Sequence, residues 1–515
     1  MRIGVDVGGT NTDAVLMSVD GVLGKVKTPT TVDVTSGIVT ALSALLDQTR
    51  VPPPAVSAVM IGTTHFTNAV VERRRLQPVA AVRLGLPATE CLPPMIDWPA
   101  DLAAVVGQHH YLVHGGNEFD GRILSELNEA EIARVADDLR LRGIMAVAVS
   151  SVFSPINGEM EFRAGELLTS RVPGLDVTYS HQIGRIGLLE RESAAILNAC
   201  LRDLARTTIS SFRQAIKEMD LGATVYLTQN DGALMTAVQA ELFPVLTFAS
   251  GPTNSMRGAA YLSGLQDAIV VDVGGTTTDV GALTRGFPRQ AALAIEVGGV
   301  RTNFRMPDVH STGLGGGSLV RADGDAVSIG PDSVGYELTQ RARIFGGETL
   351  TATDIAVAGG FAHLGDGNRV ANLPHELVAQ VTAMIGDAID LAVDRMRLSE
   401  EPLPVIIVGG GRILVTRPVA GASELVVPEH FEAANAVGAA IAQVTGEVDR
   451  VVALAGSSRE AALDTARGDA IRQAVESGAD PATIYVLDVE DVPLSYLPGN
   501  AVRVRVKVVG ELISH

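Results

Sequence analysis

Cysteines are almost absent from this sequence, whose 515 residues include only Cys91 and Cys200. A disulfide framework, or a zinc or iron–sulfur site built from cysteines, requires several of them at close spacing. The sequence therefore excludes such sites. The chain also enters an apolar strand at residues 2–7 and leaves no room for a signal peptide, so we expect a cytoplasmic location.

Basic residues are scarce as well, since 40 lysines and arginines stand against 59 aspartates and glutamates and the net charge is −19. Nucleic acids and anionic membrane surfaces are bound by basic faces, so both are disfavoured as partners. No uninterrupted apolar run reaches the roughly 18 residues of a transmembrane helix. We therefore expect neither nucleic acid nor membrane among the partners.

Apolar residues and glycines are abundant. Hydrophobic residues make up 46% of the chain, which is enough for a large core and excludes intrinsic disorder. At roughly 100–200 residues per domain, the length suggests two to four domains. The 54 glycines, beside only 4% aromatic residues, are typical of an α/β protein with many tight turns.

An internal repeat is the main signal in the sequence. Residues 6–13 read DVGGTNTD and residues 272–279 read DVGGTTTD, and each octet follows a short apolar run. A spacing of this length is far too long for a solenoid repeat. It suggests two similar halves that begin with the same strand–turn–strand unit.

Each copy of the repeat predicts a β-hairpin whose tip could bind phosphate. The apolar run predicts a buried strand, and Gly-Gly permits the tight turn that follows it. Exposed N–H groups at such a tip form an anion-binding nest, and the aspartate beside it could hold a divalent metal through water. Two facing tips would clamp a nucleotide. The alternative, a simple hairpin turn, is disfavoured by the near identity of the two octets.

A third glycine cluster, residues 409–411, follows the apolar run at residues 404–408. Glycines allow the backbone to approach a flat ligand such as adenine. Taken alone, the cluster could equally be an ordinary turn between a strand and a helix. There is no Walker A motif of the form GxxxxGK[ST], and the glycine turns differ from a dinucleotide-binding fingerprint.

The order hairpin, hairpin, glycine turn resembles the phosphate-1, phosphate-2 and adenosine motifs of the actin/Hsp70/sugar-kinase ATPase superfamily. The segments between the clusters resemble one member of it, the hydantoinase A/5-oxoprolinase family, and the chain would be a short form of it. These segments are residues 60–74 (MIGTTHFTNAVVERR), 189–199 (LERESAAILNA), 226–232 (YLTQNDG), 248–252 (FASGP) and 308–318 (DVHSTGLGGGS).

The resemblance implies an α/β fold with two RNase H-like, actin-like ATPase halves that flank a nucleotide cleft. We expect the first half at residues 1–185, with an insertion near 76–135, and the second half at 186–445. A small C-terminal α/β module would follow at 446–515, with a helix at 457–478 and strands at 483–489 and 502–508. The last strand alternates (VRVRVKV), and its basic face is either solvated or docks an acidic partner or the substrate cleft of the other half.

The resemblance also implies an activity. Members of the family use ATP and Mg²⁺ to open a lactam or a cyclic imide, such as 5-oxoproline or a hydantoin, by phosphorylating the carbonyl oxygen. Related subunits serve ketone carboxylases. A small cyclic amide is then the substrate, a hydantoinase B-type subunit is a possible partner, and an oligomer is expected.

Residue roles follow from the same resemblance. Asp6 and Asp272 would orient Mg²⁺ and its water ligands. One side of the phosphates would be held by Gly8, Gly9, Thr10, Asn11 and Thr12. The other side would be held by Gly274, Gly275, Thr276 and Thr277. Gly409, Gly410 and Gly411 would pack against adenosine.

Substrate contacts are less sharply indicated. His65 follows a strand end, where ligand sites of α/β folds gather, although it could also be a solvated turn residue. Asp308 and His310 alternate along a strand and so share a face, which allows a catalytic pair, a metal site or a structural hydrogen bond. Asp13 and Asp279 either reach the cleft or cap their strands. Residues 190–192 are expected to form a hinge or ion-pair network.

Three other functions are compatible with parts of the pattern. A small-molecule kinase of the same superfamily would use the same nucleotide motifs, and so would the nucleotide-binding subunit of a ketone carboxylase. A non-enzymatic, actin-like scaffold is disfavoured because the segments between the nucleotide motifs would have no purpose there.

Overall fold

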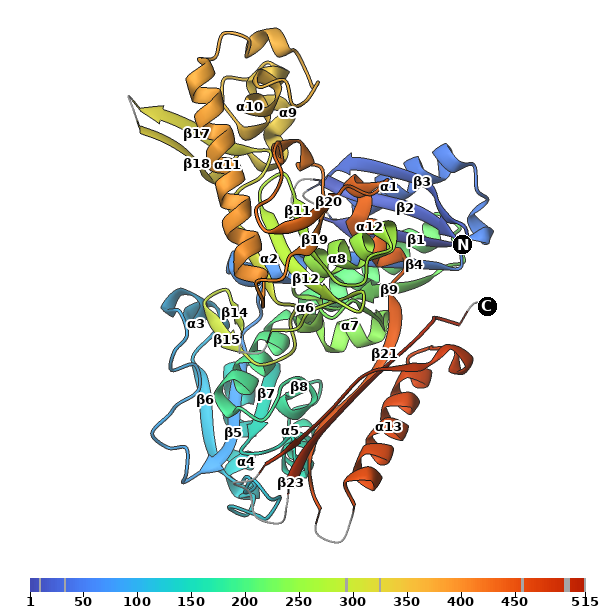
Figure 1. Cartoon of the computed structure of the whole chain (residues 1–515). Helices are drawn as coiled ribbons and strands as arrows, with labels where there is room; N and C mark the ends of the chain where they lie inside the picture. The colour runs from blue at the N-terminus through green and yellow to red at the C-terminus, as the bar shows by residue number, and fades with distance from the viewer. Residues whose placement is uncertain are drawn as a thin grey trace.

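The structure is a computed structural model that describes residues 1–8, 11–31, 34–291, 295–323, 326–454, 458–494 and 501–513. Its largest element is a nine-stranded sheet with the order β22-β23-β21-β10-β9-β4-β1-β2-β3 (Figure 1). Strands β1, β2 and β3 form an antiparallel meander, and β4 and β9 continue the sheet parallel to β1. The strands of the first half are β1 (Arg2–Val7), β2 (Asn11–Ser18), β3 (Gly21–Pro29), β4 (Ala58–Thr63), β9 (Thr224–Thr228) and β10 (Ala233–Thr236).

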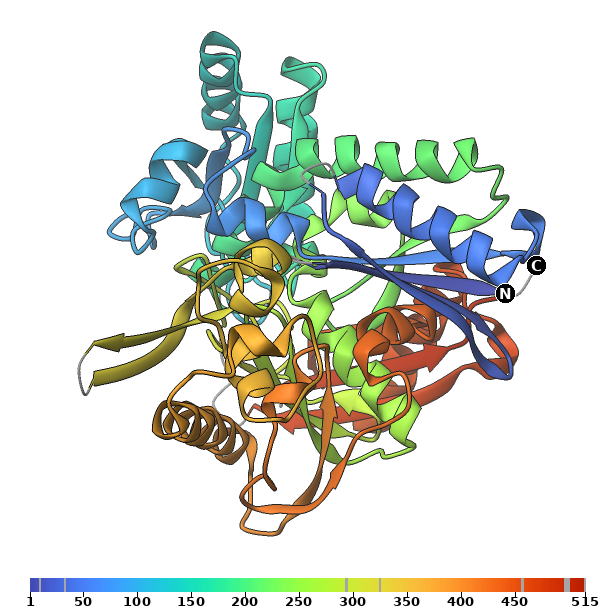
Figure 2. The same cartoon turned by 90° about the horizontal axis from the view of Figure 1, so that it is seen from above.

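Helices cover both faces of this sheet, which explains why β1 is apolar on both sides. On one face, α1 (Val34–Thr49) and the long α6 (Leu188–Glu218) lie side by side (Figure 2). Their side chains pack on Ile3, Val5 and Ile61. On the other face, α12 (Ala434–Ala440) packs on β1 and β2.

The second sheet repeats the strand order of the first around β11. Strand β12 is antiparallel to β11, whereas β19 and then β20 continue the sheet in parallel. This shared order confirms the predicted pair of RNase H-like halves. The second half contains β11 (Ala268–Val273), β12 (Thr278–Thr284), β13 (Phe287–Pro288), β16 (Val309–Thr312), β17 (Ser318–Asp323), β18 (Ala326–Ser333), β19 (Leu403–Val408), β20 (Ala422–Val426), α8 (Ser250–Ser263), α9 (Leu338–Arg341), α10 (Ala352–Ala358) and α11 (His375–Met396).

A separate four-stranded parallel sheet interrupts the first half. It has the order β6-β5-β7-β8 (Figure 1). It extends further along the chain than the insertion expected near residues 76–135. Its elements are β5 (Ala80–Leu86), α3 (Ala100–Val106), β6 (His109–His114), α4 (Glu129–Arg142), β7 (Ala146–Ser151), α5 (Glu159–Arg171) and β8 (Asp176–Tyr179).

The C-terminal module contains the helix and the two strands that the sequence predicts, preceded by a long strand. These elements are β21 (Gln443–Ala453), α13 (Arg459–Glu476), β22 (Tyr485–Pro493) and β23 (Ala501–Gly510). The strands join the first sheet, because β21 pairs with β10. Helix α13 packs on them through an alanine every fourth residue: Ala462, Ala466, Ala470 and Ala474.

Strand pairing crosses both of the predicted segment borders. Strands β9 and β10 lie after residue 185 yet belong to the first sheet, and so do β22 and β23 after residue 445. The sheets therefore do not follow the borders of the predicted division into residues 1–185, 186–445 and 446–515, and this division stays a prediction.

The basic face of β23 is not solvated, which corrects one of the two alternatives. Arg505 and Lys507 are 8% and 3% exposed. Arg505 pairs with Glu447 and Glu490, and Lys507 pairs with Asp231 of the β9–β10 loop. The acidic partners are residues of the same chain.

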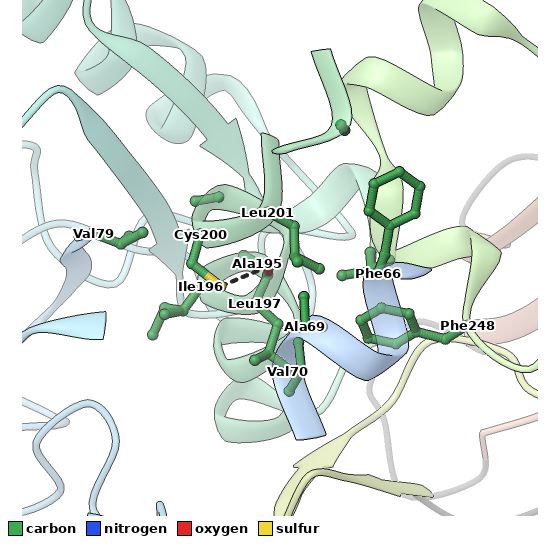
Figure 3. Packing of buried hydrophobic residues seen from close by; sticks show 14 of the residues in the cluster. Phe66, Ala69, Val70, Val79, Ala195, Ile196, Leu197, Cys200, Leu201 and Phe248 are labelled. Carbon is green, nitrogen blue, oxygen red and sulfur yellow. Dashed lines mark hydrogen bonds between the residues drawn. The ribbon is translucent and has the colours of Figure 1, made fainter. Parts of the chain in front are cut away.

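A large core cluster fixes α2 (His65–Val71), the helix that follows β4. Phe66 and Val70 of α2 pack against Phe248 and the buried face of α6, which includes Leu197 and Leu201 (Figure 3). Short elements around this core are α7 (Ala237–Leu242), β14 (Ile295–Val297) and β15 (Val300–Thr302). The start of α2, next to the first hairpin, is thereby held in place.

Helices α8 and α12 connect the two halves and touch backbone to backbone. A Cβ added at Gly258 would lie 1.9 Å from Ala434 O, and one added at Gly438 would lie 1.8 Å from Asn254 O. Only glycine fits this approach. Among the described residues, no helix is both long and apolar enough to cross a bilayer.

Substitution of Gly438 tests this contact. Gly438→Ala places a methyl group into the backbone of α8, and overpacking of this kind costs about 1–3 kcal/mol. We expect a lower melting temperature in thermal unfolding. The control is Gly468→Ala on α13, where the new Cβ meets nothing within 4 Å, so its melting temperature should be unchanged or higher. Equal melting temperatures for Gly438→Ala and the unmodified chain would contradict the close approach.

Candidate nucleotide site

The first hairpin tip lies at the end of β1. Asp6 ends the buried strand and is 5% exposed, and it stands opposite Asp13 in the strand register. The turn is closed by Gly8 N, which donates to Asn11 O at 3.0 Å. Thr12 is fully buried against Thr30, so its side chain supports the hairpin. Gly9 and Thr10 lie outside the described residues.

The second hairpin has the same strand register and the same closing hydrogen bond. Asp272 stands opposite Asp279, and Gly274 N donates to Thr277 O at 2.8 Å. The tip is open to solvent, since Thr276 and Thr277 are exposed and Gly274 and Gly275 are half-buried. The repeat in the sequence is therefore a repeat in structure.

A chain of polar contacts joins the two aspartates. Asn435 of α12 donates from Nδ2 to Asp6 Oδ2 at 3.2 Å. Ser255 of α8 contacts both Asn435 Oδ1 and Asp272 Oδ2 through its hydroxyl group. The two helices that touch through glycine thus also connect Asp6 with Asp272.

Negative charge accumulates at this site. The pKa of Asp6 is raised to about 7, because burial and the charges of Asp13 and Asp272 outweigh the hydrogen bond from Asn435 and the charge of Lys27. Burial likewise raises the pKa of Asp272 to about 6, against the hydrogen bond with Ser255. Each hairpin feels carboxylates of the other, as expected if the tips face one gap.

A divalent cation fits this arrangement. Asp6 Oδ1 is buried and has no hydrogen-bond partner in the described part of the chain. The described residues hold no group of three or more histidine, cysteine or acidic side chains that could bind a metal directly. Mg²⁺ usually keeps most of its water ligands, so two carboxylates acting through water suffice.

The third glycine cluster packs against the second hairpin. Gly411 N donates to Val273 O at 2.7 Å, and a Cβ at Gly409 would lie 2.2 Å from Asp272 Oδ1. A Cβ at Gly410, by contrast, would meet nothing within 4 Å. Gly410 is thus the residue of this turn that leaves room for a ligand beside the tip.

The glycine loop at residues 313–317 packs against the same hairpin tip through backbone hydrogen bonds. Gly316 N and Gly317 N donate to Gly274 O and Gly275 O at 3.0 and 2.7 Å. A Cβ at Gly315 would lie 2.6 Å from Thr276 N. This loop therefore positions the hairpin.

Asp308 and His310 have separate partners. Asp308 accepts from Arg289 at 2.7 Å, and His310 Nε2 lies 3.1 Å from Arg395 Nη1 on α11. These contacts favour the structural hydrogen bonds among the three alternatives, because each side chain is engaged by its own arginine. Asp279 contacts the neighbouring Ser311, and Asp13 pairs with Lys27 at 2.6 Å.

His65 lies beside the first hairpin. It lines a cavity of about 210 Å³ together with Gly8, Asn68 and Arg75, and its Nε2 lies 3.3 Å from Arg75 Nη1. At residues 190–192, Glu192 pairs with the fully buried Arg83, which confirms the expected ion-pair network.

Family models of two regions match this chain in the expected order. The hydantoinase/oxoprolinase N-terminal region matches residues 2–172, and the hydantoinase/oxoprolinase region matches residues 191–363. The chain belongs to the hydantoinase/oxoprolinase family.

Curated members of the hydantoinase/oxoprolinase family are distant relatives. Caprolactamase subunit alpha of Pseudomonas jessenii is 28% identical over 71% of this chain and 55% of its own length. The acetophenone carboxylase gamma subunit of Aromatoleum aromaticum is 26% identical over 70% and 53%. The uncharacterised protein MJ0964 of Methanocaldococcus jannaschii is 25% identical over 65% and 53%. The chain thus spans about half the length of these relatives.

Solved structures share the fold. The crystal structure of ATP-dependent caprolactamase from Pseudomonas jessenii matches all of this chain and 88% of its own with a TM-score of 0.79 at 20% identity. Nucleotide-free acetone carboxylase matches the same shares with a TM-score of 0.73 at 17% identity.

The connecting residues Ser255 and Asn435 were missed from sequence. Ser255 lies just beyond the segment 248–252 that resembles a family motif. Asn435 is the only polar side chain in α12, whose sequence is ANAVGAA. A lone asparagine in an apolar helix was the available signal, since a buried amide needs polar partners.

Substitution of Asp6 tests the charge at the site. A carboxyl whose pKa is raised on folding binds its proton more tightly when folded, so its contribution to stability is lost as pH rises from about 4 to about 7. Without metal and nucleotide, the melting temperature of the unmodified chain should therefore fall between about pH 5 and about pH 8. In the Asp6→Asn variant this fall should be smaller.

At the upper end of this range Asp6→Asn should melt above the unmodified chain. The control is Asp20→Asn in the β2–β3 turn, which should follow the unmodified chain throughout. Parallel pH profiles for Asp6→Asn and the unmodified chain would contradict the raised pKa.

Proposed function

We propose that this chain is the ATP-binding part of an enzyme that opens a cyclic amide by phosphorylating its carbonyl oxygen. One observation carries the proposal: two hairpins with the same strand register and the same closing hydrogen bond hold Asp6 and Asp272, which Asn435 and Ser255 connect. Caprolactamase and 5-oxoprolinases among the relatives support the amide substrate.

Phosphorylation answers a chemical difficulty. The C–N bond of an unstrained lactam is resonance-stabilised and hydrolyses poorly. When the carbonyl oxygen attacks the γ-phosphorus of ATP, ADP leaves and an activated imidate phosphate forms. Water can then add to the ring carbon, and the C–N bond breaks to release the amine and leave an acyl phosphate. A second water molecule hydrolyses the acyl phosphate to the carboxylate and free phosphate. Catalysis of the transfer is mostly positioning and charge neutralisation.

The described residues suit these tasks. The N–H group of Gly275 and the exposed residues Thr276 and Thr277 form one side of the proposed phosphate clamp, and Gly274 closes the turn through its hydrogen bond to Thr277 O. The first hairpin supplies the other. Asp6 and Asp272 would hold Mg²⁺ through water, and the ion would neutralise the phosphate charge. The open backbone at Gly410 is where we place adenosine.

The substrate would occupy the cavity beside Gly8. Its volume of about 210 Å³ suits a small ring, and His65, Asn68 and Arg75 offer polar contacts to an amide. It adjoins the first hairpin, so a bound ring would lie near the clamp.

A partner subunit is part of the proposal. Three relatives carry subunit names, namely caprolactamase alpha, acetophenone carboxylase gamma and acetone carboxylase beta. We propose that a partner completes the hydrolysis and that the complex is cytoplasmic and oligomeric. The carboxylase names favour one second candidate, a ketone carboxylase subunit that phosphorylates an enolate oxygen.

The test is ATP hydrolysis in the presence of 5-oxoproline, hydantoin or caprolactam, with and without a co-purified partner subunit. Stimulation by a cyclic amide supports the proposal. Stimulation only by a ketone with bicarbonate would favour the carboxylase, and a stable phosphorylated product in ³¹P NMR would favour a kinase. No stimulation in any arm would refute all three.

Substitution of Asp272 gives a sharper prediction. Asp272→Asn keeps the size of the side chain but removes the charge proposed to orient Mg²⁺, so kcat for ATP hydrolysis should fall at least about 100-fold. Asp20→Asn, in an exposed turn, should retain full activity. A kcat within about threefold of the unmodified enzyme would sink the assigned role of Asp272.

A further inference from the structure

A large cavity in the described part of the chain lies away from both hairpins. It has a volume of about 960 Å³, which is in the range of small-molecule sites. Several separate parts of the chain form its walls, among them residues 181–187 after the inserted sheet, residues 229–246, residues 303–305, and the C-terminal strands β21 and β23.

Most charges in these walls are neutralised within the protein. Arg305 pairs with Glu447 and Asp449, and Arg503 also pairs with Asp449 at 2.6 Å. Lys507, behind the wall, pairs with Asp231 at 2.7 Å. These pairs hold the C-terminal module against the first half.

Arg185 is different. It lines the cavity, and its guanidinium forms no ion pair within the described ranges. Its Nε is buried without a hydrogen-bond partner there. Burial lowers the pKa of Arg185 from its usual value, and the positive charge of Arg503 lowers it further. A nearby anion would reverse both effects.

A second donor at the same cavity lacks an acceptor. Asn230 is 3% exposed and lines the cavity, and its Nδ2 has no partner among the residues that the structure describes. Leaving one buried donor unpaired costs about 1–3 kcal/mol. A ligand with acceptor oxygens could accept hydrogen bonds from both unpaired N–H groups and would remove this cost.

A third polar group is held in a fixed orientation. His181 Nδ1 lies 2.7 Å from the fully buried Glu161, and the ring stacks edge-on against Phe162. His181 also lines the cavity, which is otherwise completed by apolar side chains such as Met235, Leu246 and Phe304. The cavity therefore combines donors with an apolar wall.

We propose that this cavity binds a small organic carboxylate with an apolar body. The carboxylate would accept hydrogen bonds from Arg185 Nε and Asn230 Nδ2, and the body would pack on Met235, Leu246 and Phe304. An arginine–carboxylate contact is a charge-assisted hydrogen bond, so charge decides the selectivity. The site is separate from the proposed nucleotide clamp.

The cavity is nevertheless connected with that clamp. Asn230 O accepts from Thr253 Oγ1 on α8 at 2.8 Å, two residues before Ser255. Thr228, two residues before Asn230, accepts from Asn254 Nδ2 at 2.9 Å. The loop that offers Asn230 to the cavity is thus bonded to the helix that contacts Asp272.

The test is isothermal titration of the full chain, without nucleotide or lactam, using phenylacetate, hexanoate, 2-phenylethanol and 2-phenylethylammonium. We expect saturable binding of a carboxylate, with the alcohol and the ammonium compound at least about tenfold weaker. Equal affinity for phenylacetate and 2-phenylethanol would overturn the proposal. So would the absence of saturable binding for both carboxylates up to about 10 mM.

Variants locate the binding. Arg185→Met should weaken phenylacetate binding at least about tenfold, to the level of the alcohol, whereas Arg185→Lys should retain part of the preference. The matched control Arg472→Met, on the exposed surface of α13, should bind as the unmodified chain does. Unchanged phenylacetate binding by Arg185→Met would overturn the proposal.

A measurement on the unmodified chain guards against misfolded variants. Phenylacetate should slow hydrogen–deuterium exchange in residues 181–187 and 303–305 but not in the second hairpin tip at 274–277. Protection at the tip alone would place the carboxylate in the nucleotide cleft and refute the separate site. Because nucleotide is absent, this result does not depend on the proposed ATP chemistry.

Discussion

The burial of carboxylates at one gap is the constraint on which the rest of this structure depends. Asp6 and Asp272 lose hydration and lie near other carboxylates, so their pKa values rise to about 7 and about 6. Such a pair persists only where the surroundings hold it in place. Ser255 and Asn435 do so, and they can reach the aspartates because α8 and α12 touch at Gly258 and Gly438.

Local features of the fold could be predicted from sequence because they are encoded locally. The octets at residues 6–13 and 272–279 specify a strand, a turn and a second strand within a few residues, and both hairpins form as expected. The two-half fold was predicted from the order of such motifs, whereas the adenosine role of the turn at residues 409–411 stays a prediction. The ion pair of Glu192 likewise lies at the helix start where charge was expected.

Features that depend on distant contacts escaped prediction. Ser255 and Asn435 meet across 180 residues of chain, and no local pattern records that meeting. From sequence, the basic face of β23 could be either solvated or docked. It is buried because Asp231 and Glu447, from distant parts of the chain, lie opposite it. The alternation of residues along the strand predicted that Asp308 and His310 share a face. It could not predict that a different arginine contacts each of them.

The return of β21 to the first sheet has a consequence for how the chain is made. Strand β10 ends at residue 236, and its partner β21 begins at residue 443, so the whole second half is synthesised in between. Until then β10 presents an unpaired edge, the kind of surface on which chains aggregate. Completion of the sheet brings residues as distant as Arg2 and Leu512 into hydrogen bonding. The first sheet can therefore be completed only after residues 443–510, which form β21, β22 and β23, have been synthesised.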